Sequence, residues 1–149
     1  NNGGGLLTQA VNIADFFMPK GQIVYTQSKD GVESVYESDN SSFGKKLVVL
    51  VNENTASASE IVSGALKISG VAKIVGETTY GKGVVQSFHP LTDGNSSIKL
   101  TTAVYYLANG ETPNGVGIKP DYEVEMDQVN IGNLENDIQL KKAMEICKE

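Results

Sequence analysis

A serine and a lysine stand at two breaks in the chain, each a few residues after a short apolar run. Ser57 follows the run Lys46–Val51 and opens a segment whose apolar residues have helical spacing. Lys82 lies between two glycines, after a second apolar run at Ala72–Val75. A hydroxyl at a helix start and an amine in a tight turn are the groups from which an acyl-transfer site can be built.

Ser57 has two interpretations. Ser57-Ala58-Ser59-Glu60 fits the S-x-x-E capping box, in which the hydroxyl serves only the helix end. Alternatively the hydroxyl is a nucleophile, because free N–H groups and the positive end of the helix dipole can stabilise an oxyanion there. The two roles compete for one oxygen, although Thr55 could take over the capping.

Two residues could act as the base. Lys82 is one, and a lysine base must be neutral near pH 7, so its pKa must fall from about 10.4 to roughly 7–8. Burial between the flanking glycines and the valines that follow could produce that shift. Gln86 lies four residues on, and on a strand it would share a face with Lys82 and orient its amine. The other candidate is His89, the single histidine, as the base of an esterase-like triad.

A nucleotide site is disfavoured, although residues 76–82 match G-x-x-x-x-G-K. The next residue is Gly83 where a phosphate-binding loop has Ser or Thr, and Val84–Phe88 has the pattern of a strand where that loop needs a helix. A further anion-binding turn is Gly3-Gly4-Gly5, which could also be an ordinary flexible terminus. Beside Ser57, one of its N–H groups could be an oxyanion donor.

The composition is that of one globular domain. The chain has 149 residues, 40% hydrophobic, and a net charge of −6, which argues against nucleic acid as a partner. No apolar run approaches the roughly 18 residues that a membrane helix needs. The single Cys147 excludes an intrachain disulfide and a multi-cysteine zinc site. We expect neither a metal nor a cofactor. Because the chain opens on a glycine-rich loop, we also expect a fragment of a longer protein.

The elements expected around these turns alternate early between helices and strands and later pair through hairpins. We expect helices over 6–18, from Ala56 onward and over about 131–149, the last starting near Asn133. Strands are expected over 22–27, 32–37, 46–51, 72–75, 84–88, 97–107 and 122–126, with exposed loops over 38–45 and 109–120. This order favours an α/β domain with a mixed β-sheet and flanking helices.

Taken together, these segments resemble the C-terminal processing, or tail-specific, serine peptidases. The resemblance spans nearly the whole chain and rests on five stretches: 1–6, 50–61, 76–86, Leu100-Thr101-Thr102-Ala103 and 115–121. It implies a core like those of crotonase and Clp protease, with Ser57 as nucleophile, Lys82 as general base and Gln86 as the orienting residue.

The resemblance also implies oxyanion donors from the Ala58 N–H and a glycine N–H, that of Gly4 with Gly5 as neighbour. The expected reaction is cleavage of proteins or peptides near apolar C-terminal tails through an acyl-enzyme, in an extracytoplasmic location. Homo-oligomers are left open, and membrane contact is expected only through segments outside this chain.

Two features depart from the family pattern. Ile68-Ser69-Gly70 stands where many members carry an acidic residue, and the peptide-binding PDZ module that normally precedes the glycine motif is not in the sequence. An alternative function is therefore a catalytically inert peptide-binding or assembly module.

Overall fold

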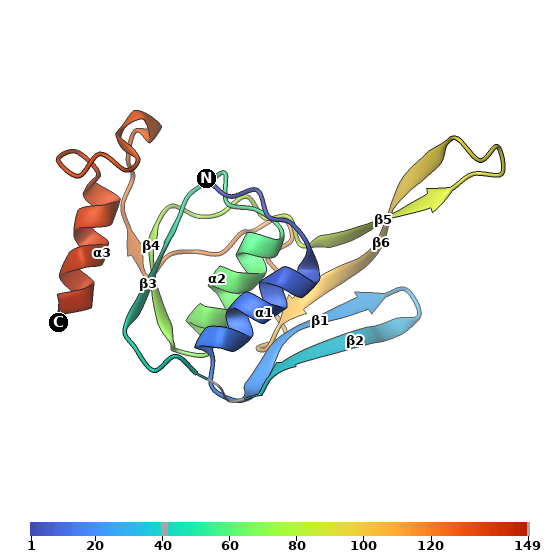
Figure 1. Cartoon of the computed structure of the whole chain (residues 1–149), viewed down its shortest axis with the longest axis horizontal. Helices are drawn as coiled ribbons and strands as arrows, with labels where there is room; N and C mark the ends of the chain where they lie inside the picture. Colours follow the sequence, from blue (N-terminus) through green and yellow to red (C-terminus); the bar gives the residue numbers. More distant parts are fainter. Residues whose placement is uncertain (40–41, 149) are drawn as a thin grey trace.

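The computed structural model describes residues 1–39 and 42–148, which form two β-sheets and three α-helices (Figure 1). The elements follow in the order α1 (Leu7–Phe17), β1 (Gly21–Ser28), β2 (Gly31–Ser38), β3 (Leu47–Val51), α2 (Ala58–Ile68), β4 (Ala72–Gly76), β5 (Val84–Pro90), β6 (Ser97–Leu107), β7 (Tyr122–Glu123) and α3 (Ile138–Lys148). A short 3-10 helix, Gln128–Asn130, precedes α3.

The first sheet is antiparallel and has the strand order β2-β1-β6-β5. Its two hairpins turn at the positions expected from the sequence. Asp30-Gly31 joins β1 to β2, with Gly31 at a φ of 120°, and Gly94 lies in the turn between β5 and β6 at a φ of 71°. The β5–β6 hairpin extends away from the rest of the molecule (Figure 1). Its outer strand, β5, is an edge of the sheet.

The second sheet is parallel, with the order β3-β4-β7. Helix α2 connects β3 to β4, which is the crossover that parallel neighbours require. The nucleophile candidate Ser57 lies at the carboxyl end of β3, where the chain turns into α2. Open α/β sheets place their ligand sites at this end of the strands.

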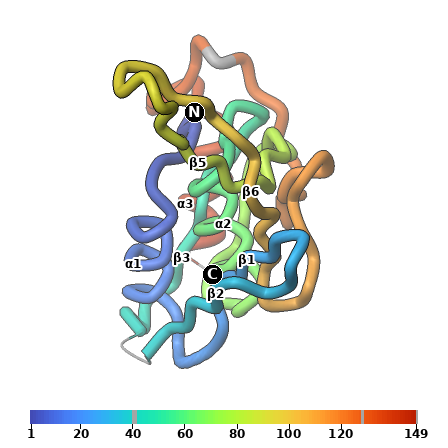
Figure 2. Tube along the Cα trace, turned by 90° about the vertical axis from the view of Figure 1, so that its right-hand side faces the viewer, coloured from blue at the N-terminus to red at the C-terminus, as the bar shows by residue number. Residues whose placement is uncertain are grey.

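Helices α1 and α2 lie side by side between the two sheets and share one core with both (Figures 1 and 2). Ala10 and Ala14 are the buried residues of α1, and Ile61, Ala65 and Leu66 are buried on α2. These positions repeat at helical spacing, as an amphipathic helix requires. The core places α2, and therefore its first residue, between the strands of both sheets.

The structure confirms the α/β class, the mixture of strand directions and the flanking helices. The strands form two sheets, one antiparallel and one parallel. Strand β7 is shorter than the expected 122–126, and α3 begins at Ile138 instead of Asn133, after a series of turns. Ser38, assigned to a loop, ends β2 and is buried. Residues 40 and 41 of that loop and residue 149 of the final helix lie outside the described residues.

No helix in the described part is long and apolar enough to cross a membrane.

Candidate active site

Ser57 occupies a strained turn between β3 and α2. Its φ of 57° and ψ of −122° make it the one non-glycine residue with positive φ in the described part of the chain. Such a conformation costs of order 1–3 kcal/mol and is concentrated at functional sites. A serine held in this way at a sharp strand-to-helix turn has the geometry of a nucleophile elbow.

Ser57 caps helix α2 as the S-x-x-E pattern predicts. Ser57 and Glu60 form a capping box, in which the Glu60 carboxylate accepts the Ser57 N–H at 2.7 Å and the Glu60 N–H donates to the Ser57 carbonyl oxygen at 2.8 Å. The Thr55 hydroxyl does not take over the cap, and accepts the Asn52 N–H at 3.0 Å. The role of the Ser57 hydroxyl as a nucleophile stays a prediction.

The Glu60 carboxylate joins the Ser57 turn to the Lys82 turn. Glu60 is fully buried. Its Oε2 accepts the N–H groups of Ser57 at 2.7 Å and Lys82 at 2.8 Å, while its Oε1 accepts the Gly81 N–H at 2.7 Å and the Thr79 hydroxyl. Four donors on one carboxylate meet the requirement that a buried charge be hydrogen-bonded on all sides. The Glu60 side chain thus links the two turns directly.

Tyr105 connects the same two turns from the side of β6. Its side chain is 1% exposed, and its hydroxyl lies 3.1 Å from the Ser57 carbonyl oxygen and 2.7 Å from the Lys82 carbonyl oxygen. Burial, and then the negative charge of Glu60, raise the pKa of the Tyr105 phenol. The phenol therefore stays protonated, and its one hydrogen is shared between these two carbonyl oxygens.

The N-terminal glycine segment is packed against the Ser57 turn and is not a free end. The Ala56 N–H donates to the Asn2 carbonyl at 3.0 Å. Gly4 has a φ of +94°, and a Cβ built on it would lie 2.6 Å from the Ala56 oxygen and 2.9 Å from the Ala58 nitrogen. Only glycine fits this approach, so the family-like glycine motif is explained by close contact with the nucleophile turn.

The loop over 109–120 supports the Lys82 turn on its other side. The Gly115 N–H donates to the Gly81 oxygen at 2.9 Å, and the Ile118 N–H donates to the Thr79 hydroxyl at 2.7 Å. A Cβ on Gly117 would lie 2.2 Å from the Thr79 oxygen, so this loop also needs glycine for close packing. The lysine turn is consequently held on both sides, by Glu60 and by this loop.

A cavity of about 340 Å³ brings the predicted site residues together. Ser57, Ala58, Lys82, Gln86 and Gly5 all line it. The remaining lining residues are Leu6, Leu7, Ile61, Val84, Val85, Phe88, Lys99 and Tyr105. The cavity is mostly apolar around a hydroxyl and an amine, which is the pattern of a substrate site.

The structure differs in three ways from the roles predicted for Ser57, Lys82 and Gln86. Lys82 precedes β5 and is not on a strand, and a bulge lies between Val85 and Gln86, so the shared strand face expected for Lys82 and Gln86 is wrong even though both line the cavity. Gln86 is exposed, and its Nε2 lies 3.5 Å from the Thr101 hydroxyl. No hydrogen bond joins the Ser57 hydroxyl, the Lys82 amine or the Gln86 amide to one another within residues 1–39 and 42–148.

Gly4 and Gly5, the two glycines of the expected oxyanion site, differ in the cavities that they line. The Gly4 N–H donates to the Asn2 Oδ1 at 3.0 Å, and Gly4 lines a neighbouring cavity of about 330 Å³. Gly5 lines both that cavity and the one that holds Ser57. Ala58 is the first residue of α2, where N–H groups have no partner within the helix.

The alternative base and the nucleotide site are not supported by the fold. His89 is exposed on β5 and is not among the residues that line the Ser57 cavity. The Gly76–Lys82 segment leads into β5, not into a helix, so the phosphate-binding interpretation fails as expected. Among the described residues no cluster of His, Cys, Asp and Glu could hold a metal ion.

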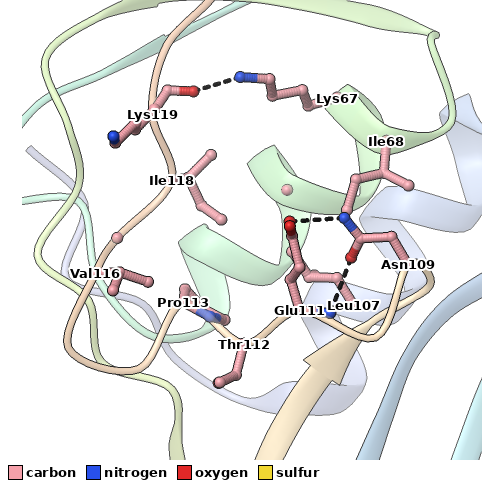
Figure 3. A pocket seen from close by; sticks show the side chains of 12 residues that line it. Lys67, Ile68, Leu107, Asn109, Glu111, Thr112, Pro113, Val116, Ile118 and Lys119 are labelled. Carbon is pink, nitrogen blue, oxygen red and sulfur yellow. Dashed lines mark hydrogen bonds between the residues drawn. The ribbon is translucent and has the colours of Figure 1, made fainter.

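A larger cavity lies away from these groups, between the C-terminal half of α2 and the loop after β6 (Figure 3). It measures about 570 Å³ and is bordered by the Asn109–Glu111 and Lys67–Lys119 hydrogen bonds. Its lining holds two lysines but no serine, cysteine or histidine, so we assign the chemistry to the smaller cavity.

Two site residues could not be identified from the sequence pattern. Glu60 has a capping-box signal, but that signal concerns only Ser57 and not the contacts with Gly81 and Lys82, 21 and 22 residues away. Tyr105 lies in a β-strand pattern in which any aromatic residue is favoured. No local signal indicated that its hydroxyl reaches Ser57, 48 residues away.

Comparisons with known proteins identify the family of this arrangement. The sequence profile described as Peptidase family S41 matches residues 1–124. The chain is 39% identical over 149 residues to a carboxyl-terminal-processing protease of Synechocystis, covering 98% of this chain and 35% of that protein. It is 41% identical over 127 residues to the chloroplastic C-terminal processing peptidase of Tetradesmus obliquus, covering 84% and 27% of the two chains. The chain therefore spans about a third of the length of these curated relatives.

Solved structures support the same family and fold. The photosystem II D1 C-terminal processing protease superposes with a TM-score of 0.78 at 40% identity, over 83% of this chain and 32% of that one. The tricorn protease superposes with a TM-score of 0.57 at 20% identity, over 97% of this chain and 14% of that one, which shows a shared fold. The expected Clp-protease-like core is thereby confirmed.

Proposed function

Because this chain belongs to peptidase family S41, with carboxyl-terminal processing proteases as relatives, we propose that it forms the catalytic centre of a serine endopeptidase. The proposed substrates are proteins or peptides with apolar, poorly structured C-terminal tails. The proposed centre is a Ser57–Lys82 dyad assisted by Gln86, without metal or cofactor.

One observation carries the proposal. Two buried side chains, Glu60 and Tyr105, each bind the turn of Ser57 and the turn of Lys82, beside a cavity that both residues line. A hydroxyl and an amine whose backbones are fixed in this way by four hydrogen bonds are prepared for chemistry between them. A helix cap alone would need only the contact between Glu60 and the Ser57 N–H, and a solvated lysine would need none of these contacts.

In the proposed reaction the Ser57 oxygen attacks the carbonyl carbon of the scissile peptide bond. Lys82, as the neutral amine, takes the hydroxyl proton and then gives it to the nitrogen of the leaving chain as the peptide bond breaks. An acyl-enzyme remains on Ser57. Water, deprotonated by Lys82, attacks the ester and releases the second product, which returns both residues to their starting states.

The negative charge on the carbonyl oxygen is proposed to be stabilised by two backbone N–H groups. The Ala58 N–H at the first position of α2 is the first donor, supported by the dipole of the helix. The second is a glycine N–H of the N-terminal segment, from Gly4 or Gly5. Gly5 lines the cavity, whereas Gly4 already donates to Asn2 and would have to exchange that partner for the substrate.

Substrate is proposed to bind as an extended chain along β5. This strand is the outer edge of its sheet, so its free backbone groups can pair with a peptide. The cavity next to it offers Leu7, Ile61 and Val85 to an apolar side chain. This apolar lining supports the preference for apolar tails.

The remaining expectations stay predictions. Nucleic acid is not an expected partner of a chain with a net charge of −6, and homo-oligomers are left open. We infer an extracytoplasmic location, for which the chloroplastic relatives offer indirect support. The family match supports an enzyme and gives no support to an inert peptide-binding or assembly module.

The dyad can be tested by substitution in the complete polypeptide. Ser57→Ala and Lys82→Ala should each lower kcat on an apolar-tailed peptide by at least about 10³-fold, because members of a catalytic unit fail together. Circular dichroism and thermal unfolding should remain close to wild type, since both side chains line the cavity and neither belongs to the buried core.

Matched controls are Ser59→Ala, on the same helix, and Lys73→Ala, an exposed lysine on β4; both should keep wild-type turnover. Wild-type turnover near pH 7 in Lys82→Ala would show that the dyad assignment is wrong. Loss of activity in His89→Ala with full activity in Lys82→Ala would instead establish the esterase-like base.

A further inference from the structure

A second lysine lines the Ser57 cavity, and the proposed reaction does not use it. Lys99 lies on β6 directly opposite Phe88 on β5, and its Nζ is 5.5 Å from the centre of the Phe88 ring. Both side chains border the same cavity as Ser57 and Lys82. The ring therefore holds the ammonium group beside the cavity through a cation–π contact.

The charge of Lys99 is not balanced by the protein. Neither the Lys67–Asp121 nor the Lys142–Glu145 ion pair involves Lys99, which is exposed. No Asp or Glu lines the cavity, although the chain as a whole carries a net charge of −6. A positive group next to an apolar cavity, with no acid beside it, is complementary to an anion brought by the substrate.

The strand register gives the distance at which this anion would lie. The Phe88–Lys99 pair is two positions along the hairpin from the Gln86–Thr101 pair. Strands rise about 3.3 Å per residue, so the two pairs are roughly 7 Å apart along β5. A peptide extended along β5 advances at the same rate. A group two or three residues from the one opposite Gln86 is thus level with the Phe88–Lys99 pair along the strand.

We propose that Lys99, held by Phe88, forms a subsite for a carboxylate of the substrate. The carboxylate is either the C-terminus of the chain being cleaved or an Asp or Glu side chain two to three residues from the scissile bond. This inference rests on the proposed peptidase function and deepens it. It makes the site select peptide bonds near a negative charge as well as near apolar residues.

The experiment compares three peptides with one apolar sequence, cleaved by the complete polypeptide. One ends in a free carboxylate, the second in an amide, and the third in an amide with a Glu side chain two residues after the scissile bond. We expect kcat/KM to be about 3- to 10-fold higher for a carboxylate peptide than for the plain amide, mainly through KM. The preference should disappear in 1 M NaCl, where charges are screened within about 3 Å.

Variants assign the preference to Lys99. In Lys99→Gln the ratio of kcat/KM between carboxylate and amide peptides should fall to about one, and Lys99→Arg should restore it. Lys73→Gln removes the same charge from β4 and should keep the wild-type ratio. Binding to the Ser57→Ala variant, measured by fluorescence anisotropy, should show the same carboxylate preference without any turnover.

The outcomes separate the two proposals. Equal kcat/KM for all three peptides in the wild type, or a preference that survives in Lys99→Gln, overturns the subsite while Ser57 chemistry stands. A preference for the free terminus alone or for the Glu side chain alone supports the subsite and identifies the source of the carboxylate. A wild type that cleaves none of the peptides and binds none in the Ser57→Ala form overturns the subsite and the proposed function together.

Discussion

Glu60 shows how one buried side chain can organise a site without touching the substrate. Its carboxylate is 0% exposed and accepts hydrogen bonds from four donors that belong to two separate turns. Hydrogen bonds to a charged group contribute about 1.5–3 kcal/mol each, so this is the most strongly hydrogen-bonded side chain near Ser57. We regard it as a positioning residue for Ser57 and Lys82.

The prediction at this scale is Glu60→Gln. The carboxylate accepts hydrogen bonds through both oxygens, whereas an amide has one oxygen and one NH2 group. At least one backbone N–H is therefore left without an acceptor. We expect kcat to fall by about 10²-fold or more and the free energy of unfolding to fall by about 2–4 kcal/mol. Both are measurable by peptide cleavage and urea titration.

Glu33→Gln, which neutralises an exposed acid on β2, should change neither quantity. If Glu60→Gln lowered stability but left kcat per folded molecule intact, Glu60 would be a structural residue and not a positioning one.

At the scale of elements, the site depends on segments that pack against the α2 N-terminus from two directions. The N-terminal segment contributes the Asn2 carbonyl to the Ala56 N–H, and the loop over 109–120 fixes the lysine turn. Both contacts need glycine because another backbone lies within van der Waals distance of the Cα. The glycine-rich stretches of the sequence are thus packing contacts at the site.

Gly4→Ala tests the N-terminal contact. Its Cβ would lie 2.9 Å from the Ala58 nitrogen, and the φ of +94° is unfavourable for alanine. We expect the segment to move away from Ser57 and kcat to fall by 10- to 10³-fold, as when one oxyanion donor is lost. A fluorophosphonate probe read by mass spectrometry should label Ser57 correspondingly more slowly.

Gly3→Ala is the matched control, because a Cβ there meets nothing within 4 Å. It should keep wild-type kcat. Equal activity in both variants would contradict the contribution of this segment to the oxyanion site.

At the scale of the whole molecule, the helix after the family match packs on the sheet far from the nucleophile. Helix α3 follows residue 124, and its residues Ala143 and Ile146 are buried. The Asp137 carboxylate accepts the Leu140 N–H at 2.7 Å, and the Gln139 amide donates to the Val124 carbonyl at 2.8 Å. The Asp137 contact caps the start of α3, and the Gln139 contact joins α3 to the residue after β7. Figure 1 shows α3 beside β3 and β4.

Ile146→Ala should therefore separate stability from activity. Removing a buried isoleucine side chain costs about 2–5 kcal/mol, which should appear as a lower midpoint of thermal unfolding. The kcat/KM measured well below that midpoint should not change, because Ile146 lies beside Leu47 and Ala72 and not at the Ser57 cavity.

Met144→Ala, at a position 49% exposed on the same helix, should cost less than about 1 kcal/mol. A parallel fall of kcat/KM in Ile146→Ala would mean that α3 is coupled to the site.

The sequence by itself determined the elements and the candidate groups. Strand, turn and helix around Ser57, the Gly-Lys-Gly turn and both hairpins follow from local periodicity and turn residues, and the structure has them where the pattern predicts. The α/β class follows from their order. These features depend on neighbours within a few residues, which is why a single sequence contains them.

Only the tertiary structure decided how the groups are brought together. The contacts of Glu60 with Lys82 and of Tyr105 with Ser57 span 22 and 48 residues, and no local pattern encodes them. The division into two sheets, the docking of the N-terminal glycines and the place of Lys99 beside the cavity arise in the same way. Each depends on which surfaces meet when the core between the sheets forms, and that is set by burial over the whole chain.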